Sequence, residues 1–325
     1  MIFKVMVFAA LATNIFASDI LTLYRNNGIA NIEKQMDLEL TKEDYWDKQI
    51  DKKDTTFGFV ESYENILYCD KSQPTLEYYK LDGQKYKLQK SHKAYVGKLD
   101  GDKKKEGDLK TPVGVYNLTQ KLSKDTKLDI FYGPYAFVTT YPNLYDKYQN
   151  KSGSGIWIHG LPPENVQRDS FTRGCIAIQN NNIECLNNNI NLDKTILIID
   201  EKPKASSISR ETLVKLLTDL YKWRFAWKYD EIDNYLSYYD DAFVRDDGMK
   251  IDEFKTYKKR VFSKNERKSI VFNKIDIFAY PNSSDVYQIT FNEEYRSDSF
   301  KFSGGKVLIV KLEKNQDRFK ILTEK

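Results

Sequence analysis

His159 and Cys175 are the residues of this sequence whose types and spacing are best suited to chemistry. His159 is followed by Gly160, and Cys175, sixteen positions on, is preceded by Gly174 in a polar segment. A thiol with an ordinary pKa of about 8.5 is only a few per cent thiolate at pH 7, so a neighbouring base makes it far more reactive. We therefore interpret Cys175 as a nucleophile and His159 as its general base, the pair that a cysteine peptidase uses.

Neighbouring residues could support the same reaction. Arg173 brings a positive charge near the thiol, and backbone N–H groups of the turn at Gly174 could hold an oxyanion, where one donor is worth about 3–4 kcal/mol. Glycine at 160 and 174 allows positive φ or a close approach of substrate to the backbone. A histidine and a cysteine on strands are also common core residues, so the spacing alone leaves a catalytic and a structural interpretation open.

The elements that must position this pair are short strands. Apolar segments 156–158 and 176–178 adjoin the two residues, and side by side they would bring His159 and Cys175 within hydrogen-bond reach. Asp82-Gly83 predicts a hairpin turn. Turns rich in glycine, proline and asparagine separate further strands, which indicates an all-β sandwich or barrel. These strands are expected at residues 66–69, 76–81, 84–88, 94–96, 113–116, 136–139 and 195–199.

Helical periodicity flanks this strand-rich region. Before it, residues 18–58 are charged, with Ile29, Ile32 and Met36 at helical spacing. After the polar segment 200–206, apolar stripes return and are followed by strands, which predicts an α+β domain. Its helices are expected over 213–227, 232–243 and 251–261, and its strands over 269–278, 286–291, 306–312 and 318–322.

The first residues have the three regions of a secretory signal. Lys4 precedes an apolar run from Val5 to Phe16, and the small residue Ala17 follows. The run is shorter than a bilayer-spanning helix needs, and no later segment has that length. We therefore expect residues 1–17 to be a signal peptide and the mature protein to be periplasmic, with no integral membrane segment.

Composition narrows the function classes. Lysine and arginine (51) nearly balance aspartate and glutamate (47), and a net charge of +4 with interleaved signs argues against a nucleic-acid partner. Three cysteines leave at least one thiol unpaired, and Cys69 and Cys185 lie in apolar contexts typical of core residues. The two histidines, of which His92 lies in a solvated strand or turn, are too few for a zinc site, so no metal or cofactor is expected.

Four linked motifs make the central region resemble the L,D-transpeptidase catalytic domain of the YkuD type. His159-Gly160 and Thr172-Arg-Gly-Cys-Ile176 correspond to the family's His-Gly and Ser/Thr-x-Gly-Cys boxes. Upstream, Val96-Gly-Lys98 and Lys110-Thr-Pro-Val-Gly-Val-Tyr116 resemble its Gly-Lys and Thr-Pro-x-Gly-x-Tyr segments. The resemblance runs in the family's order from about residue 63 to 200.

This resemblance implies a mechanism. In the family, the residue at Cys175 attacks the carbonyl of meso-diaminopimelate in a peptidoglycan stem tetrapeptide and expels the terminal D-Ala. The residue at His159 acts first as base and then as acid for the leaving amine. The resemblance also implies that the backbone carbonyl of Gly160 orients His159, while the Gly174 N–H remains the oxyanion donor expected from the residues. The residues expected to contact substrate are Trp157, Arg173 and Ala177.

One departure separates this chain from the common family box. Ala177 stands two places after the cysteine, where arginine is common, which removes a bidentate carboxylate clamp. The same departure resembles the L,D-carboxypeptidases that trim tetrapeptides to tripeptides and shape helical bacteria. Those proteins also carry a short N-terminal segment and a C-terminal nuclear-transport-factor-2-like (NTF2-like) domain. The resemblance therefore favours water as the acyl acceptor, with L,D-transpeptidation to an amine as the alternative.

The expected architecture is α+β and multidomain. It comprises a signal peptide (1–17), a helical N-terminal segment (18–58), an L,D-transpeptidase-type sandwich or barrel (59–203) and an NTF2-like cone (204–325). The N-terminal segment is too small to fold alone, so it is expected to pack on a neighbour or to form a homodimer. An alternative of another class is a peptidoglycan-binding module, in which Lys306 and Glu324 at a pocket mouth would suit a zwitterionic peptide.

Overall fold

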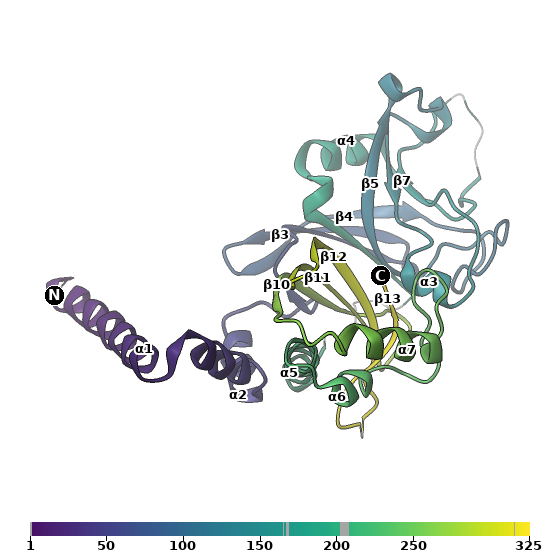
Figure 1. Ribbon diagram of the computed structural model, residues 1–325. Helices are drawn as coiled ribbons and strands as arrows, with labels where there is room; N and C mark the ends of the chain where they lie inside the picture. Colours follow the sequence, from purple (N-terminus) through teal and green to yellow (C-terminus); the bar gives the residue numbers. More distant parts are fainter. Residues whose placement is uncertain (1, 165, 167–168, 202–207, 315) are drawn as a thin grey trace.

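The computed structural model describes residues 2–164, 166, 169–201, 208–314 and 316–325. It shows a helical N-terminal arm, a β-barrel and a C-terminal body in which helices pack on a sheet (Figure 1). The predicted α+β, multidomain fold class is therefore confirmed. The polar segment 200–206, which we interpret as a linker, lies mostly outside the described residues. Within the described part of the chain, no helix is long and apolar enough to cross a membrane.

The N-terminal arm consists of α1 (Ile2–Glu39) and α2 (Glu43–Ile50). Gly28 interrupts α1 with a φ of 73°, a conformation that glycine adopts without steric cost. The arm extends away from the rest of the molecule (Figure 1). Of the three apolar residues at helical spacing, Ile32 is buried, whereas Ile29 and Met36 are exposed. The reason is that only the end of α1 packs on the C-terminal body.

The end of α1 is attached to the C-terminal body through a buried carboxylate. Asp37 accepts hydrogen bonds from Arg224, from Lys228 (2.6 Å) and from the hydroxyl of Tyr229 (2.9 Å). Such a charge costs free energy to bury unless it is paired and hydrogen-bonded, and here three donors satisfy it.

A closed barrel of eight strands forms the middle of the molecule, in the order β2-β3-β4-β8-β7-β6-β5-β9. The strands are β2 (Asn65–Asp70), β3 (Thr75–Asp82), β4 (Lys85–Tyr95), β5 (Gly114–Ser123), β6 (Tyr135–Thr139), β7 (Trp157–His159), β8 (Ile176–Ile178) and β9 (Thr195–Asp200). Residues 94–96, expected as a separate strand, instead fall at the end of β4 and just beyond it, because β4 continues past its hairpin. Leu67, Ile158, Ile176 and Leu197 lie in the barrel core.

Two helices of the barrel domain, α3 (Leu144–Tyr148) and α4 (Asn180–Asn189), were not predicted. The α4 sequence contains six asparagines, which have low helix propensity, and only Ile183 and Leu186 are buried. Cys185 on this helix is partly exposed, which corrects the expectation of a core residue, while Cys69 is buried as predicted. His92 is also buried, opposite Leu76 in the β3–β4 ladder, so its predicted solvated position is wrong.

The C-terminal body packs helices against a five-stranded sheet in the order β1-β10-β11-β12-β13. Its strands are β1 (Phe59–Val60), β10 (Ser269–Ala279), β11 (Val286–Arg296), β12 (Lys301–Lys311) and β13 (Lys320–Glu324), and its helices are α5 (Arg210–Lys228), α6 (Ile232–Leu236) and α7 (Ile251–Phe262). Trp223 and Trp227 belong to its core. The second helix is shorter than predicted, although Tyr239 and Phe243 beyond α6 are still buried.

The two bodies contact each other through polar and apolar residues. The carboxylate of Asp276 on β10 accepts hydrogen bonds from the backbone N–H groups of Glu61 and Ser62 (2.8 and 2.9 Å), in the segment that leads from β1 into the barrel. The side-chain amide of Asn143 in the barrel domain donates to the Tyr280 hydroxyl (3.0 Å). Phe278 shares one apolar cluster with barrel residues. These contacts fix the barrel, and with it the predicted catalytic pair, on the C-terminal body.

Candidate active site

Strands β7 and β8 lie side by side, as the sequence predicts, and they run parallel. Ile158 pairs with Ile176, and His159 pairs with Ala177. Both isoleucines are fully buried, so their packing sets the position of the polar residues next to them. Cys175 immediately precedes β8, and His159 ends β7, which places base and nucleophile at one region of the barrel.

His159 is held by its own neighbour in sequence. Its Nδ1 lies 2.6 Å from the carbonyl oxygen of Gly160, the contact that the family resemblance implies. A carbonyl oxygen only accepts, so Nδ1 carries the proton when the imidazole is neutral. Tyr132 packs against the ring edge-on, with the ring centroids 5.1 Å apart. This arrangement leaves Nε2 as the basic nitrogen.

Cys175 is partly exposed and is a free thiol. Its Sγ donates to the carbonyl of Gly155 at 3.3 Å. Burial raises the pKa of the thiol above its ordinary value, while the Trp157 backbone N–H and the charge of Lys103 lower it to a smaller extent. Burial is the largest of these effects, so on balance the pKa of the Cys175 thiol lies above its ordinary value. Arg173 is exposed at the wall of the same cavity, and its expected effect on the thiol stays a prediction.

A cavity of about 590 Å³ connects these groups. Its walls include His159, Arg173, Cys175 and Ala177, four of the residues predicted to act on substrate. Trp157, which was also predicted to contact substrate, is not among the residues that line the cavity. Its ring packs on Tyr132, which does line the cavity, with centroids 5.0 Å apart. The size suits a peptide end of a few residues.

The turn before the nucleophile needs glycine at position 174. Gly174 has a φ of 136°, and a Cβ there would lie 2.8 Å from the Lys110 carbonyl oxygen. Its N–H donates to Thr172 Oγ1 (3.1 Å), and that hydroxyl donates to the Cys175 carbonyl (2.6 Å). The oxyanion role of Gly174 therefore stays a proposal, and it requires the bond to Thr172 to open.

The roles of three residues near the nucleophile escaped the sequence analysis: those of Tyr132, of Lys103, and of Thr172, which was named only as part of the family box. Tyr132 ends a short 3-10 turn, for which the aromatic pair before Gly133 is the sequence signal. Lys103 is buried and pairs with Asp108 at 2.8 Å. That lysine lies in the run Lys103-Lys-Lys105, which looks like solvated charge in sequence. Only the structure shows that the Lys103 side chain points inward.

Lys306 and Glu324 lie in the C-terminal body, away from this cavity. They form an ion pair at 3.4 Å beside a second cavity of about 560 Å³, which Lys306 lines. Glu324 is 3% exposed and accepts from the Tyr239 hydroxyl (3.0 Å), so its expected place at a pocket mouth is wrong. Lys258 also lines this cavity, and burial lowers its pKa to about 8. The ion pair of Lys306 and Glu324 is therefore internal, because the Glu324 side chain on β13 points into the C-terminal body.

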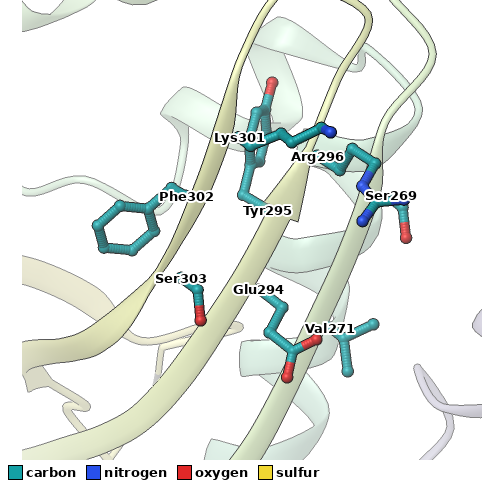
Figure 2. Close-up of a pocket in the computed structure, with 8 residues that line it drawn as sticks. All are labelled: Ser269, Val271, Glu294, Tyr295, Arg296, Lys301, Phe302 and Ser303. Carbon is teal, nitrogen blue, oxygen red and sulfur yellow. The ribbon is translucent and has the colours of Figure 1, made fainter.

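A hollow on the C-terminal sheet adjoins the second cavity, with which it shares Tyr295 and Phe302 (Figure 2). The side chains of Arg296 and Lys301 lie at one end and those of Glu294 and Val271 at the other (Figure 2). These residues belong to β10, β11 and β12, and none of them was predicted to act on substrate. His159 and Cys175 line the barrel cavity and do not line this hollow.

Comparison with known proteins agrees with the two-part architecture. Residues 64–199 match the L,D-transpeptidase catalytic domain, and residues 215–325 match the Cds6 C-terminal NTF2-like domain. YafK of Escherichia coli (strain K12) is 32% identical over 117 residues, 35% of this chain. The chain spans 42% of the length of that relative.

Two solved structures resemble the chain over most of its length. The helical cell shape determining protein Pgp2 from Campylobacter jejuni is 39% identical, with a TM-score of 0.79, over 88% of this chain and 100% of that one. Bd1075 of Bdellovibrio bacteriovorus is 30% identical, with a TM-score of 0.64, over 81% and 92% of the two chains. The chain therefore belongs to the L,D-transpeptidase family, in the form whose YkuD-type catalytic domain is accompanied by a C-terminal NTF2-like domain.

Proposed function

We propose that this protein is a peptidoglycan L,D-carboxypeptidase that removes the terminal D-Ala from meso-diaminopimelate in stem tetrapeptides. The observation that carries the proposal is the shared cavity that both the oriented His159 and the Cys175 thiol line. Membership in a family of cysteine-based, peptidoglycan-modifying enzymes supports the substrate class. The likeness to Pgp2, a cell shape determining protein, supports a contribution to cell shape.

The proposed reaction has two steps. His159 Nε2 takes the thiol proton as Cys175 Sγ bonds to the diaminopimelate carbonyl carbon. The C–N bond to D-Ala then breaks, and the proton passes to the departing amine, leaving a thioester. In the second step, water gives a proton to His159 and attacks the thioester, which releases the tripeptide and restores the thiol. The raised pKa of the Cys175 thiol is compatible with this order, because the base acts during the attack.

Water is favoured as the acceptor by the residue at position 177. Ala177 lines the cavity next to the base, and its methyl group offers no charge to a second peptide's carboxylate. The common arginine would supply a bidentate clamp there. L,D-transpeptidation, which would cross-link peptides or attach a protein to peptidoglycan, is the competing outcome of the same thioester.

Incubation with disaccharide tetrapeptide, followed by mass analysis, tests the proposal. Release of D-Ala and formation of tripeptide would support a carboxypeptidase. Cross-linked dimers as the main product would establish a transpeptidase instead. Cys175→Ala serves as the control and should form neither product while keeping a wild-type melting temperature, since the side chain is small and partly exposed.

A second function, peptide or glycan binding by the C-terminal body, is favoured by its polar cavity. Lys258, Glu293 and Lys306 line the cavity, and aromatic rings adjoin it. Opposite charges in one cavity suit a zwitterionic peptide. Muropeptide titration of Cys175→Ala, with and without Lys306→Ala, separates the two sites. Equal affinity in both proteins would remove this binding role.

We also propose export and self-association through the N-terminal arm. A signal peptide at residues 1–17 would direct the protein to the periplasm, where its substrate lies. Beyond it, Ile20, Leu21, Leu23 and Tyr24 are exposed apolar residues on α1. Light scattering of residues 18–325 and of its Leu21→Glu variant tests the homodimer. A monomeric mass for the unaltered chain would contradict it.

A further inference from the structure

We propose that Asn180 is a positioning residue that sets the direction and tautomer of the base. Its side chain does not contact the imidazole. It holds the peptide unit between Gly160 and Leu161, and the other end of that unit holds His159. The inference rests on the proposed roles of His159 and Cys175, and it adds a residue that the family motifs described above do not include.

The contacts run through one planar group. Asn180 Oδ1 accepts a hydrogen bond from the Leu161 N–H at 2.7 Å. The Gly160 carbonyl oxygen lies 2.6 Å from His159 Nδ1. This N–H and this C=O belong to the same peptide bond, which is planar and trans, so they point in opposite directions. Fixing the N–H end therefore fixes the line along which the carbonyl meets the imidazole.

The same arrangement strengthens the contact. A hydrogen bond to the N–H end polarises a peptide unit and makes its carbonyl a better acceptor, because bonds in a chain reinforce one another. A better acceptor favours the Nδ1–H tautomer of the neutral imidazole and the imidazolium that forms during attack. Asn180 thus acts on the basicity of Nε2 as well as on its position.

Two glycines make room for the amide. A Cβ at Gly160 would lie 2.5 Å from Asn180 Oδ1, and a Cβ at Gly133 would lie 2.6 Å from the same atom. Either would displace the oxygen, since real Cβ atoms do not approach this closely. The Asn180 oxygen therefore occupies a slot that is open only because both backbone segments carry glycine there. This close fit restricts the amide to one orientation.

The position of Asn180 in the chain connects base and nucleophile. Asn180 opens α4, two residues after the end of β8, and β8 begins directly after Cys175. The segment that carries the nucleophile thus also carries the group that holds the peptide of the base. A shift of β8 along β7 would displace the Cys175 thiol. Through Asn180, it would also weaken the contact that orients the His159 imidazole.

The test compares three variants. Asn180→Ala removes the acceptor, Asn180→Asp keeps an oxygen at the same place, and Asn181→Ala is the control on the same turn of α4, where the side chain is exposed. Imidazole ¹⁵N NMR reports the tautomer. The chain has two histidines, so His92 is an internal reference for His159. Steady-state rates with disaccharide tetrapeptide give kcat and KM separately.

We expect Asn180→Ala to lower kcat by roughly tenfold or more with little change in KM, as loss of an orienting partner does elsewhere. Its His159 spectrum should shift from the Nδ1–H tautomer toward a mixture. Asn180→Asp should keep the tautomer and most of kcat, and Asn181→Ala should match wild type in both. The His92 signals should stay constant throughout.

An unchanged tautomer and kcat in Asn180→Ala would overturn the proposal. Equal losses in the Ala and Asp variants, with equally lowered melting temperatures, would also overturn it, because they would assign the effect to packing of the loop. The NMR measurement needs no turnover. Failure of the wild-type protein to act on the tetrapeptide would therefore contradict the proposed function, while the tautomer would still decide the role of Asn180.

Discussion

Ala177 lies directly opposite His159 in the parallel pairing of β7 and β8. Successive residues of a strand point to opposite faces, so position 177 shares its face with position 175, the nucleophile. A side chain introduced at 177 would therefore enter the catalytic cavity between base and substrate. This relationship makes position 177 the natural place to look for control of the acyl acceptor.

Ala177→Arg should increase cross-linking relative to hydrolysis. An arginine in the cavity could hold the carboxylate of an acceptor peptide through charge-assisted hydrogen bonds, which are roughly twice as strong as neutral ones. Product ratios measured with excess acceptor peptide check this, with Ala177→Met as the control for size. If the ratios of Arg and wild type agree, the shape of the cavity loop around Pro162 and Phe171 decides the acceptor.

Alkylation of Cys175 by iodoacetamide should accelerate with pH along a curve whose midpoint lies above the ordinary thiol value. The reason is that burial raises the pKa of this thiol, so the thiolate appears only at higher pH. A Cys185→Ser background removes the other partly exposed thiol. Cys69 is buried, and its pKa is raised to about 12, so it should not react. A midpoint below pH 8 would mean that a thiolate–imidazolium pair forms before substrate binds.

His159→Ala should lower kcat by about 10²–10⁴-fold, the usual contribution of a general base and acid. Both the attack of the thiol and the departure of D-Ala need its proton transfers. The measurement is single-turnover release of D-Ala, with His92→Ala as the matched control because that histidine lies on β4, outside the cavity lining. Release at the wild-type rate in the His159 variant would exclude it as the base.

Asp276→Asn should make the free energy of unfolding less dependent on pH. Burial raises the pKa of Asp276 to about 6, so the folded protein keeps a proton that the unfolded chain releases near pH 4. Stability therefore falls as pH rises from about 4 to 6, by about 3 kcal/mol for a shift of two units. Asparagine keeps an oxygen for the N–H groups of Glu61 and Ser62 and carries no charge.

Urea unfolding at pH 4 and at pH 7.5 measures this effect. The two proteins should be similar at the lower pH, and the asparagine variant should be the more stable one at the higher pH. Parallel pH dependence in both would show that Asp276 does not titrate in this range. Gln288→Glu, on the neighbouring strand, would serve as a control for adding a carboxylate to the same sheet.

The strands around the active site could be predicted because each is a short apolar run bounded by turn residues. Residues 176–178 are an example, and β8 spans the same residues. By contrast, α4 could not be predicted, since six asparagines give no helical periodicity and packing of Ile183 and Leu186 decides its conformation. Asn180 was missed for the same reason.

Contacts of the site between residues that are neighbours in sequence could be predicted. Features that depend on burial by distant parts of the chain could not. His159 and Gly160 are neighbours, so their contact follows from the motif. The raised thiol pKa of Cys175 depends on the whole wall of the cavity. The inward position of Lys103 depends on the partner Asp108 and on a loop that no periodicity marks. Glu324 was misplaced because its alternation along β13 does not show what covers the strand.

Strand β1 pairs with β10, so the C-terminal sheet takes its edge strand from the chain before the barrel begins. The chain enters the barrel after β1 and returns to the C-terminal body after β9. The barrel is thus an insertion within the body that surrounds it in sequence, and two covalent crossings join the two. Deleting the chain after β9 would therefore remove β10, the partner strand of β1, and leave β1 unpaired.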